Sequence, residues 1–158
     1  MRVEQLMPRP VQSCRHSDTL ARAAQLMWDF DCGCLPVVSD PRSKRIAGIL
    51  TDRDICMCAL FKNKPLHEIQ VSEAMAKEVL VCQTSDDLGQ AELIMREARV
   101  RRVPVTDDDG ALVGMLSLAD LAHEAAREVD TSRHDITEMD VGDTLAAICT
   151  PSHKELAA

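Results

Sequence analysis

Hydrophobic positions near the start of the chain recur at the spacing of an amphipathic helix. The pattern i, i+3, i+4, i+7 is formed by Leu20, Ala23, Ala24 and Met27. We expect this helix to be capped by Asp18 and to stop near Gly33. An earlier stretch, residues 3–7, predicts a single helical turn that ends at Pro8.

Strands are expected on either side of this helix. Short apolar segments predict strands at residues 11–14, 34–38 and 45–50, and turn-forming residues at 40–43 separate the last two. A second helix is expected from Thr51 to about Leu60, because a threonine after an apolar strand suits a helix N-cap. The chain therefore begins with a unit of strand, helix, two strands and helix.

The same order of elements returns later in the chain at a nearly constant shift. Segments that match at a shift of 68 are Val71–Met75 with Val3–Met7, Val79–Cys82 with the first strand, Leu88 with Leu20, and Val103–Val105 with Leu35–Val37. After the prolines the shift falls to 66, because the turn at residues 107–110 is two residues shorter than its counterpart. A deletion confined to a turn is typical of two copies of one fold, so the sequence predicts an internal duplication.

One motif in each copy carries candidate chemistry. Gly48–Asp54 returns as Gly114–Asp120, and both copies read as strand, hydroxyl and helix, with an aspartate three residues after the hydroxyl. A helix N-terminus beside a hydroxyl suits a phosphate, and an acceptor-only carboxylate suits a pair of sugar hydroxyls. The alternative interpretation is that each hydroxyl and aspartate only cap their helix, which is worth about 1 kcal/mol.

Charge and hydropathy narrow the class of protein. The chain has 158 residues with 26 acidic and 18 basic side chains, which gives a formal charge of −8. This charge argues against a broad contact with nucleic acid or with an anionic bilayer. No apolar run approaches the ~20 residues that span a membrane, and residues 1–10 lack the apolar core of a signal peptide. We expect a cytoplasmic protein whose partners include neither nucleic acid nor a membrane.

The cysteines are numerous for this length, and their spacing leaves their role open. The seven are Cys14, Cys32, Cys34, Cys56, Cys58, Cys82 and Cys149. Four of them form two C-x-C pairs, whereas structural zinc sites typically use C-x2-C or wider spacing. Packing in the core is therefore the first interpretation, with a zinc site or an exposed redox thiol as alternatives.

Other candidate chemistry is sparse in this sequence. The acidic run Asp107–Asp109 superficially resembles a calcium loop, but the remaining ligand positions are missing, which favours an acidic hairpin turn. The five histidines form no H-x3-H cluster, and the sequence contains no catalytic dyad and no P-loop. We therefore expect a protein without enzymatic activity and without a catalytic cofactor.

The two copies resemble a tandem pair of CBS domains, the regulatory unit called a Bateman module. The resemblance covers roughly residues 1–127 and rests on L-P-V-V and G-I-L-T-D-R-D in the first copy and V-P-V and G-M-L-S-L-A-D in the second. Among such modules, the chain is most similar to stand-alone pairs of the hypoxic-response type. The resemblance implies an α/β (α+β) fold of two β-α-β-β-α repeats, packed sheet to sheet with pseudo-twofold symmetry, plus a short C-terminal helical tail. We place repeat 1 at residues 1–64, repeat 2 at 65–129 and the tail at 130–158.

The resemblance also implies two sites for adenosine-containing ligands, namely AMP, ADP, ATP, NAD or S-adenosylmethionine. The first site would comprise Ser13, Cys14, Leu35, Pro36, Val37, Thr51, Arg53 and Asp54. The second would comprise Val81, Cys82, Arg102, Val103, Pro104, Ser117 and Asp120. The hydroxyls of Thr51 and Ser117 and the Arg102 cation are assigned to phosphate, and the two aspartates to ribose. Arg53 offers a further guanidinium for a phosphate in the first site.

Together these features predict a non-catalytic regulatory module. It would act as a homodimer that binds an adenine nucleotide and signals to a partner protein. The alternative is an accessory dimerisation module whose sites are vestigial and empty. Residues 141–149 have an apolar face too small to form a core, so we expect them to dock on the module or on the partner subunit of a dimer.

Overall fold

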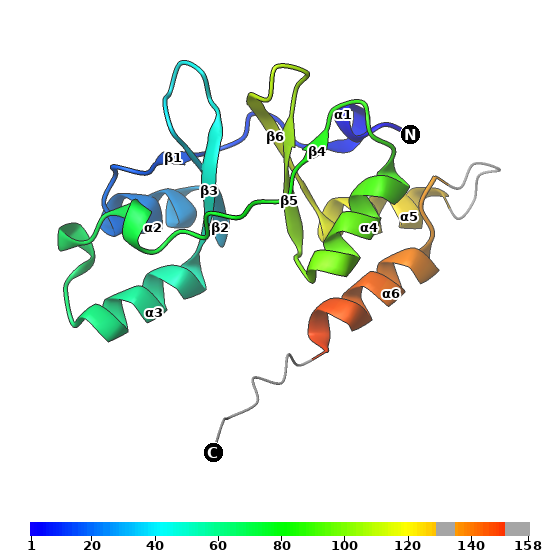
Figure 1. Cartoon of the computed structure of the whole chain (residues 1–158). Helices are drawn as coiled ribbons and strands as arrows, with labels where there is room; N and C mark the ends of the chain where they lie inside the picture. Colours follow the sequence, from blue (N-terminus) through cyan, green and yellow to red (C-terminus); the bar gives the residue numbers. More distant parts are fainter. Residues whose placement is uncertain (129–134, 151–158) are drawn as a thin grey trace. The chain divides into compact units, whose positions relative to one another are not determined.

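A computed structural model describes residues 1–128 and 135–150 of the chain. These residues divide into two compact units that are not contiguous in sequence. Unit 1 contains Met1–Pro8, Cys82–Val105 and the described residues from Met115 onward, and unit 2 contains Arg9–Val81 and Thr106–Gly114. Figure 1 shows the elements of both units along the chain.

Unit 2 holds the first repeat. Its elements are β1 (Cys14–Arg15), α2 (Leu20–Asp29), β2 (Cys34–Val38), β3 (Ile46–Thr51), α3 (Asp52–Lys62), and the short 3-10 helices η1 (Leu66–Glu68) and η2 (Val71–Glu73). Strand β2 is central, parallel to β1 and antiparallel to β3. The register sets Cys14 opposite Val37 and Cys34 opposite Thr51.

The second repeat forms the same order of elements. They are β4 (Cys82–Gln83), α4 (Leu88–Ala98), β5 (Arg102–Thr106), β6 (Leu112–Ser117) and α5 (Leu118–Glu128), preceded in the chain by α1 (Val3–Leu6) and followed by α6 (Glu138–Cys149). The second sheet has the strand order β4-β5-β6, which repeats the order of the first sheet. The prediction of a duplicated mixed α/β fold is therefore confirmed.

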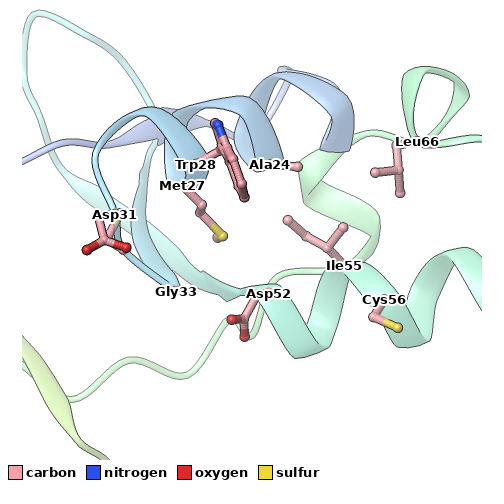
Figure 2. A pocket seen from close by; sticks show the side chains of 10 residues that line it. Ala24, Met27, Trp28, Asp31, Gly33, Asp52, Ile55, Cys56 and Leu66 are labelled. Atoms are coloured by element: carbon pink, nitrogen blue, oxygen red, sulfur yellow. The ribbon is translucent and has the colours of Figure 1, made fainter.

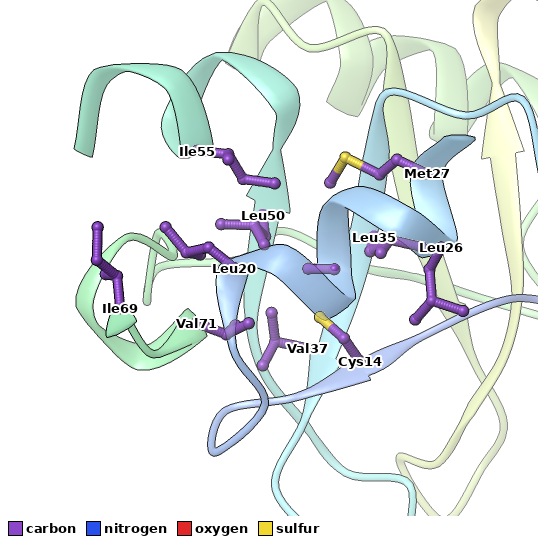
Figure 3. Packing of buried hydrophobic residues seen from close by; sticks show 11 residues of the cluster. Cys14, Leu20, Leu26, Met27, Leu35, Val37, Leu50, Ile55, Ile69 and Val71 are labelled. Atoms are coloured by element: carbon purple, nitrogen blue, oxygen red, sulfur yellow. The ribbon is translucent and has the colours of Figure 1, made fainter. Parts of the chain in front are cut away.

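The core of unit 2 lies between its sheet and α2. Figure 3 shows the buried side chains of α2 facing those of β2 and β3, with Ile69 and Val71 closing one side. The α2 residues Leu20, Ala23 and Met27 are buried, as their spacing predicted. Alternate residues of β2, Leu35 and Val37, also point into this core.

Helix α2 begins one residue later than predicted. Its N-cap is Thr19, whose side chain accepts from the backbone N–H of Arg22 at 3.2 Å, so the prediction of Asp18 as the cap is wrong. The Asp18 carboxylate instead accepts from the backbone N–H of Arg15 at 2.8 Å and from Arg15 Nε at 3.1 Å. A carboxylate engaged by the preceding turn is not available to the helix, and the next hydroxyl takes its place.

The first strand of each copy is shorter and later than predicted. The predicted strands at 11–14 and 79–82 are observed as Cys14–Arg15 and Cys82–Gln83. In the first sheet, β1 pairs only with Val37 and Val38 at the end of β2. The residues before Cys14 are therefore not paired with β2. Ser13 and Val81 consequently lie outside the strands.

The repeat analysis paired two short helical turns, residues 3–7 and 71–75. Each turn stands at the start of one copy in the sequence but packs in the unit that holds the other copy. The backbone N–H of Val3 in α1 donates to Asp86 O at 2.9 Å, within unit 1. The backbone N–H of Val71 in η2 donates to Asp18 O at 2.8 Å, within unit 2. Each compact unit is therefore completed by a turn that precedes the other copy in sequence.

Position 48 on β3 requires glycine, because the backbone of Ala76 approaches it closely. A Cβ atom at this position would lie 2.7 Å from Ala76 O, in the segment that pairs with Ile49 along the edge of β3. We expect Gly48→Ala to lower the free energy of unfolding by about 1–3 kcal/mol, measured by chemical denaturation. Gly142 is the matched control, because a Cβ there meets nothing within 4 Å and helix α6 should gain about 0.5–1 kcal/mol from Gly142→Ala. Equal stability of the two variants would contradict this account of Gly48.

Helix α6 docks on unit 1, so of the two expected docking places, the module and a partner subunit, the structure shows the module. It lies against α4 and α5, beside α4 in Figure 1. Thr144 is fully buried and donates through Oγ1 to the carboxylate of Glu92, which is itself buried on α4. None of the helices in the described parts of the chain is long and apolar enough to cross a membrane.

Candidate functional site

The hydroxyl and aspartate of the first copy form a capping box at the start of α3. The backbone N–H and Oγ1 of Thr51 donate to Asp54 Oδ2 at 2.9 and 2.7 Å, and the backbone N–H of Asp54 donates to Thr51 Oγ1 at 3.1 Å. Both side chains are half-buried. The local sequence therefore places hydroxyl and carboxylate together at a helix N-terminus, and both bonds to the carboxylate end on Oδ2.

The second copy repeats this geometry at the start of α5. The backbone N–H and Oγ of Ser117 donate to Asp120 Oδ2 at 2.8 and 2.6 Å, and the backbone N–H of Asp120 donates to Ser117 Oγ at 3.2 Å. The caps expected from the sequence are thus present in both copies. Capping is the role that the hydrogen bonds show for these side chains.

A third copy of the same box occurs in the tail, where no nucleotide site is expected. Thr137 donates through its backbone N–H and Oγ1 to Asp140 Oδ2 at 2.9 and 2.6 Å, and these bonds lower the pKa of the Asp140 carboxyl. The signal T-E-M-D was present in the sequence but lies outside the repeat. Because one box of identical geometry caps a helix elsewhere, the box alone does not identify a ligand site. The surroundings of each box must do so.

In unit 1, the hydroxyl lies in a cavity together with basic side chains. Arg101, Arg102 and Ser117 line a cavity of about 370 Å³, and its other walls are Leu118, Ala119, Ala122, Val141 and Leu145. No ion pair within residues 1–128 and 135–150 engages either arginine. Asp120 is not part of the lining, and the predicted neighbours Val103 and Pro104 are buried in β5. Two free guanidiniums, a hydroxyl and a helix N-terminus are groups that bind a phosphate.

The equivalent place in unit 2 carries less positive charge. The repeat shift aligns Gly33 with Arg101 and Asp52 with Leu118. The backbone is the same in both, since the N–H of Asp52 donates to Gly33 O at 3.1 Å and that of Leu118 donates to Arg101 O at 2.9 Å. Arg53 is exposed and supplies the single cation of the predicted first site. A phosphate would therefore meet more negative charge beside Thr51 than beside Ser117.

The remaining predicted residues of the first site can contribute backbone but little side chain. Cys14, Leu35 and Val37 point into the core, and Pro36 is buried on the same strand. Thr51 pairs with Cys34 of β2, and Cys14 pairs with Val37 of β2. Cys34 and Val37 are three residues apart along the strand, a distance of about 10 Å. Cys14 and Thr51, both predicted for the first site, therefore lie toward opposite ends of the first sheet.

The second predicted site is divided between the two units. Cys82, Arg102, Ser117 and Asp120 belong to unit 1, but Val81 belongs to unit 2. There Val81 lines a cavity of about 320 Å³ whose basic lining residues are Arg45 and Lys77. Sequence reasoning missed these two cations, because Arg45, directly before β3, and Lys77, in the loop after η2, belong to no motif.

The cysteines at the first strands are structural thiols. Burial raises the pKa of Cys14 to about 12, with a further contribution from the nearby Asp18 charge. Burial likewise raises the pKa of Cys82 to about 12, with Asp86 adding to it. Thiols with such pKa values stay protonated at neutral pH and are poor nucleophiles. The interpretation of these two cysteines as core residues is confirmed.

Metal chemistry has little support in the part of the chain that the structure describes. No group of three or more His, Cys, Asp or Glu residues is arranged there to hold a metal ion. Asp107 accepts through Oδ1 from the backbone N–H of Asp109 at 3.1 Å and of Ala111 at 2.8 Å. The acidic run therefore forms a hairpin turn, as its sequence favoured.

Comparison with known proteins connects this geometry to a family. The CBS domain profile matches residues 3–59 and 71–127. Hypoxic response protein 1 of Mycobacterium tuberculosis is 31% identical over 134 residues, which cover 85% of this chain and 84% of that protein. The crystal structure of Hypoxic Response Protein I with two coordinated zinc ions is similar to this chain, with a TM-score of 0.70, 30% identity, and coverage of 78% of this chain and 98% of that one. The structure of CBSX2 in complex with AMP has a TM-score of 0.68 and 26% identity, covering 80% and 96% of the two chains. The chain with its two matched repeats belongs to the CBS domain family.

Proposed function

We propose that this protein is a non-catalytic sensor of adenosine-containing ligands, with its phosphate site at Ser117 in unit 1. The observation that carries the proposal is the cavity that brings the free Arg101 and Arg102 guanidiniums together with the Ser117 hydroxyl. It is supported by the similarity of the chain to CBSX2 in complex with AMP. The protein would act as a homodimer in the cytoplasm and signal to a regulated protein partner.

Each group in this site would have a separate role. Arg102 and the backbone N–H of Ala119 in the first turn of α5 would bind the phosphate, because the N–H groups of Leu118 and Asp120 already donate to Arg101 O and Ser117 Oγ. Ser117 would release its bond to Asp120 and donate to a phosphate oxygen. The second oxygen of Asp120, which the capping bonds leave unused, would accept from the ribose hydroxyls. Thr51, Arg53 and Asp54 would form the corresponding site in unit 2, with weaker preference for phosphate because Asp52 lies beside it.

Thermal unfolding in the presence of AMP, ADP, ATP, NAD and S-adenosylmethionine tests this function. A ligand at 100 times its Kd stabilises the folded state by about 2.7 kcal/mol, which raises the melting temperature by roughly 5–10 °C for a chain of this size. We expect a shift with at least one nucleotide, reduced in Asp120→Ala and in Arg102→Ala. Asp54→Ala should reduce the shift only if the unit 2 site is also filled.

Asp87→Ala is the matched control for this experiment. It removes the capping carboxylate from α4, no residue of which lines the Ser117 cavity, so it should lower the basal melting temperature and leave the nucleotide-induced shift intact. A nucleotide shift that survives both Asp120→Ala and Arg102→Ala would show that our site is wrong.

The alternative is a structural dimerisation module with vestigial sites. The third capping box at Thr137 favours it, because there the same geometry serves only as a cap. Absence of any thermal shift with all five ligands would support this alternative.

A further inference from the structure

A polar cavity of about 650 Å³ lies in unit 2 between β1, α2 and the turn that joins β2 to β3, and we call it the β1–α2 cavity. The cavity between α2 and α3 is different, because its charged lining residues are Asp31 and Asp52 and most of its other walls are apolar (Figure 2). The polar lining residues of the β1–α2 cavity include Arg15, Arg22, Lys44, Asp18, Gln12 and Ser13. Its volume is within the range of small-molecule sites, about 300–1,000 Å³.

The β1–α2 cavity is a positively charged place on an acidic chain. Three cations against the one carboxylate of Asp18 give its lining a net charge of +2, whereas the whole chain carries −8. Asp40 of the neighbouring turn does not line the cavity, and its carboxylate accepts from the backbone N–H groups of Arg42 and Ser43 at 3.3 and 3.1 Å. The cavity therefore favours a small anion, although the chain as a whole repels anions.

The three cations come from β1, α2 and the turn before β3, and two of them are held in place. Asp18 Oδ1 lies 3.1 Å from Arg15 Nε and 3.0 Å from Nη2, so it orients this guanidinium and leaves Nη1 for a ligand. The backbone N–H of Lys44 donates to Asp40 O at 2.9 Å, and its carbonyl accepts from the N–H of Leu112 at 3.0 Å. Among the described residues, no ion pair engages Arg22 or Lys44. Cations that converge in this way on one cavity are suited to a phosphate.

The second copy forms the same backbone without these cations. The repeat shifts align Arg15 with Gln83, Arg22 with Gln90 and Lys44 with Gly110. The N–H of Arg15 donates to Asp18 Oδ2 at 2.8 Å. In the second copy, the N–H of Gln83 donates to Asp86 Oδ2 at 2.7 Å, which closes the same turn. The fold therefore requires a cation at none of the three positions, and a ligand of the first copy would explain all three.

Lys44 has a backbone conformation that favours glycine. Its φ is 49°, and Gly110, the equivalent residue of the second copy, has a φ of 78°. A residue with a Cβ atom is strained in this left-handed region, whereas glycine is not. The first copy thus keeps a cation beside the cavity at a position where a lysine destabilises the turn.

The β1–α2 cavity is separate from the predicted phosphate end of the first nucleotide site. Val38 lines the cavity and lies four residues along β2 from Cys34, which pairs with Thr51, so the two places are about 13 Å apart. Of the residues predicted for that nucleotide site, Ser13 and Cys14 also line the cavity. A ligand of the β1–α2 cavity therefore has its own cations and does not need Thr51.

We propose that the β1–α2 cavity binds a small molecule that carries phosphate. A phosphate monoester has three terminal oxygens and a charge of about −1.5 to −2 at neutral pH, which matches the three cations and the +2 of the lining. A carboxylate offers only two oxygens and one charge. Gln12 and Ser13, both half-buried, would donate to the rest of the ligand. The inference does not depend on the Ser117 site, because the two cavities share no lining residue.

Isothermal titration calorimetry with inorganic pyrophosphate tests the proposal. The full-length chain carries Arg101→Ala and Arg102→Ala, so that the Ser117 cavity does not contribute. We expect saturable binding at one site, and citrate should bind at least about tenfold more weakly, because it has carboxylates in place of phosphates. Arg22→Gln should weaken pyrophosphate binding at least about tenfold, because it removes a charge-assisted hydrogen bond. Titration with glycerol 3-phosphate then distinguishes a phosphate ester from an inorganic ligand, and tighter binding of either supports the site.

Two further variants make the test specific. Arg15→Gln with Arg22→Gln and Lys44→Gly introduces the residue types of the second copy, so this variant should fold, as circular dichroism would show, and should not bind pyrophosphate. Arg42→Gln is the matched control, because it removes a cation from the same turn that does not line the cavity, and it should change the affinity by no more than about twofold.

Three results would overturn the proposal. They are the absence of saturable binding, binding that persists in the triple variant, and an equal loss in Arg42→Gln and Arg22→Gln. Citrate that binds as tightly as pyrophosphate would overturn the assignment to phosphate. Because the Ser117 cavity is disabled in this experiment, its failure would leave the proposed nucleotide site unaffected.

Discussion

Replacement of Leu50 by alanine is expected to lower the free energy of unfolding by about 2–5 kcal/mol. Leu50 lies on β3 opposite Leu35 of β2, and its side chain is fully buried in the core of unit 2. Alanine removes buried methyl groups and leaves a cavity that the surrounding side chains fill only in part. Urea unfolding followed by far-ultraviolet circular dichroism measures the loss.

Leu60→Ala is the matched control for this prediction. Leu60 is also a leucine, but it lies on the outer side of α3 and is 66% exposed. Its truncation should change the free energy of unfolding by no more than about 0.5 kcal/mol. A Leu50→Ala variant that lost less than about 1 kcal/mol would contradict the assignment of Leu50 to the centre of the core.

Deletion of residues 136–158 is expected to lower the melting temperature by roughly 5–10 °C. Burial of Ile136 contributes about 1.5–3 kcal/mol, and the hydrogen bond from Thr144 to the Glu92 carboxylate contributes a similar amount. The entropy of ordering the helix offsets part of this sum. For a chain of this size each kcal/mol corresponds to about 2–4 °C. Differential scanning calorimetry measures the change.

Two point variants on α6 distinguish the stability that its docking provides from the effect of shortening the chain. Among the described residues, Thr144→Val leaves the buried Glu92 carboxylate with Arg96 alone, whose Nη1 lies 3.7 Å from it, so the variant should reproduce part of the loss. Met139→Ala on the same helix changes a side chain that is 76% exposed and should leave the melting temperature unchanged. Should the deletion melt within about 1 °C of the full chain, docking of α6 would contribute nothing to stability.

The three capping boxes show where sequence reasoning about the site stops. Ser117 with Asp120 and Thr137 with Asp140 share a hydroxyl, an aspartate, the same spacing and the same hydrogen bonds. Their difference is the cavity beside Ser117, which brings Arg101 and Arg102 next to the hydroxyl. A cap depends on residues three positions apart, whereas a binding site depends on residues brought together by the fold.

The repeat itself was readable from the sequence because it depends on local signals. The spacing of Leu20, Ala23 and Met27 predicted the buried face of α2, and the threonine at position 51 predicted the start of α3. Matches at a constant shift then predicted the second copy and, through its motifs, the family. The N-cap of α2 was predicted at Asp18 and is observed at Thr19. Both adjacent side chains can cap a helix, and local spacing does not show which of them does so.

By itself, the sequence determined the duplication, the order of the elements and the family, since periodicity, caps and turns act over a few residues and leave their pattern in the chain. Only the tertiary structure decided that α1 joins unit 1 and η2 joins unit 2, that α6 packs on α4 and α5, and that Trp28 on α2 is exposed. These outcomes depend on which distant surfaces match in shape and charge. Residues far apart in sequence contribute to each such surface, so no local pattern reports it.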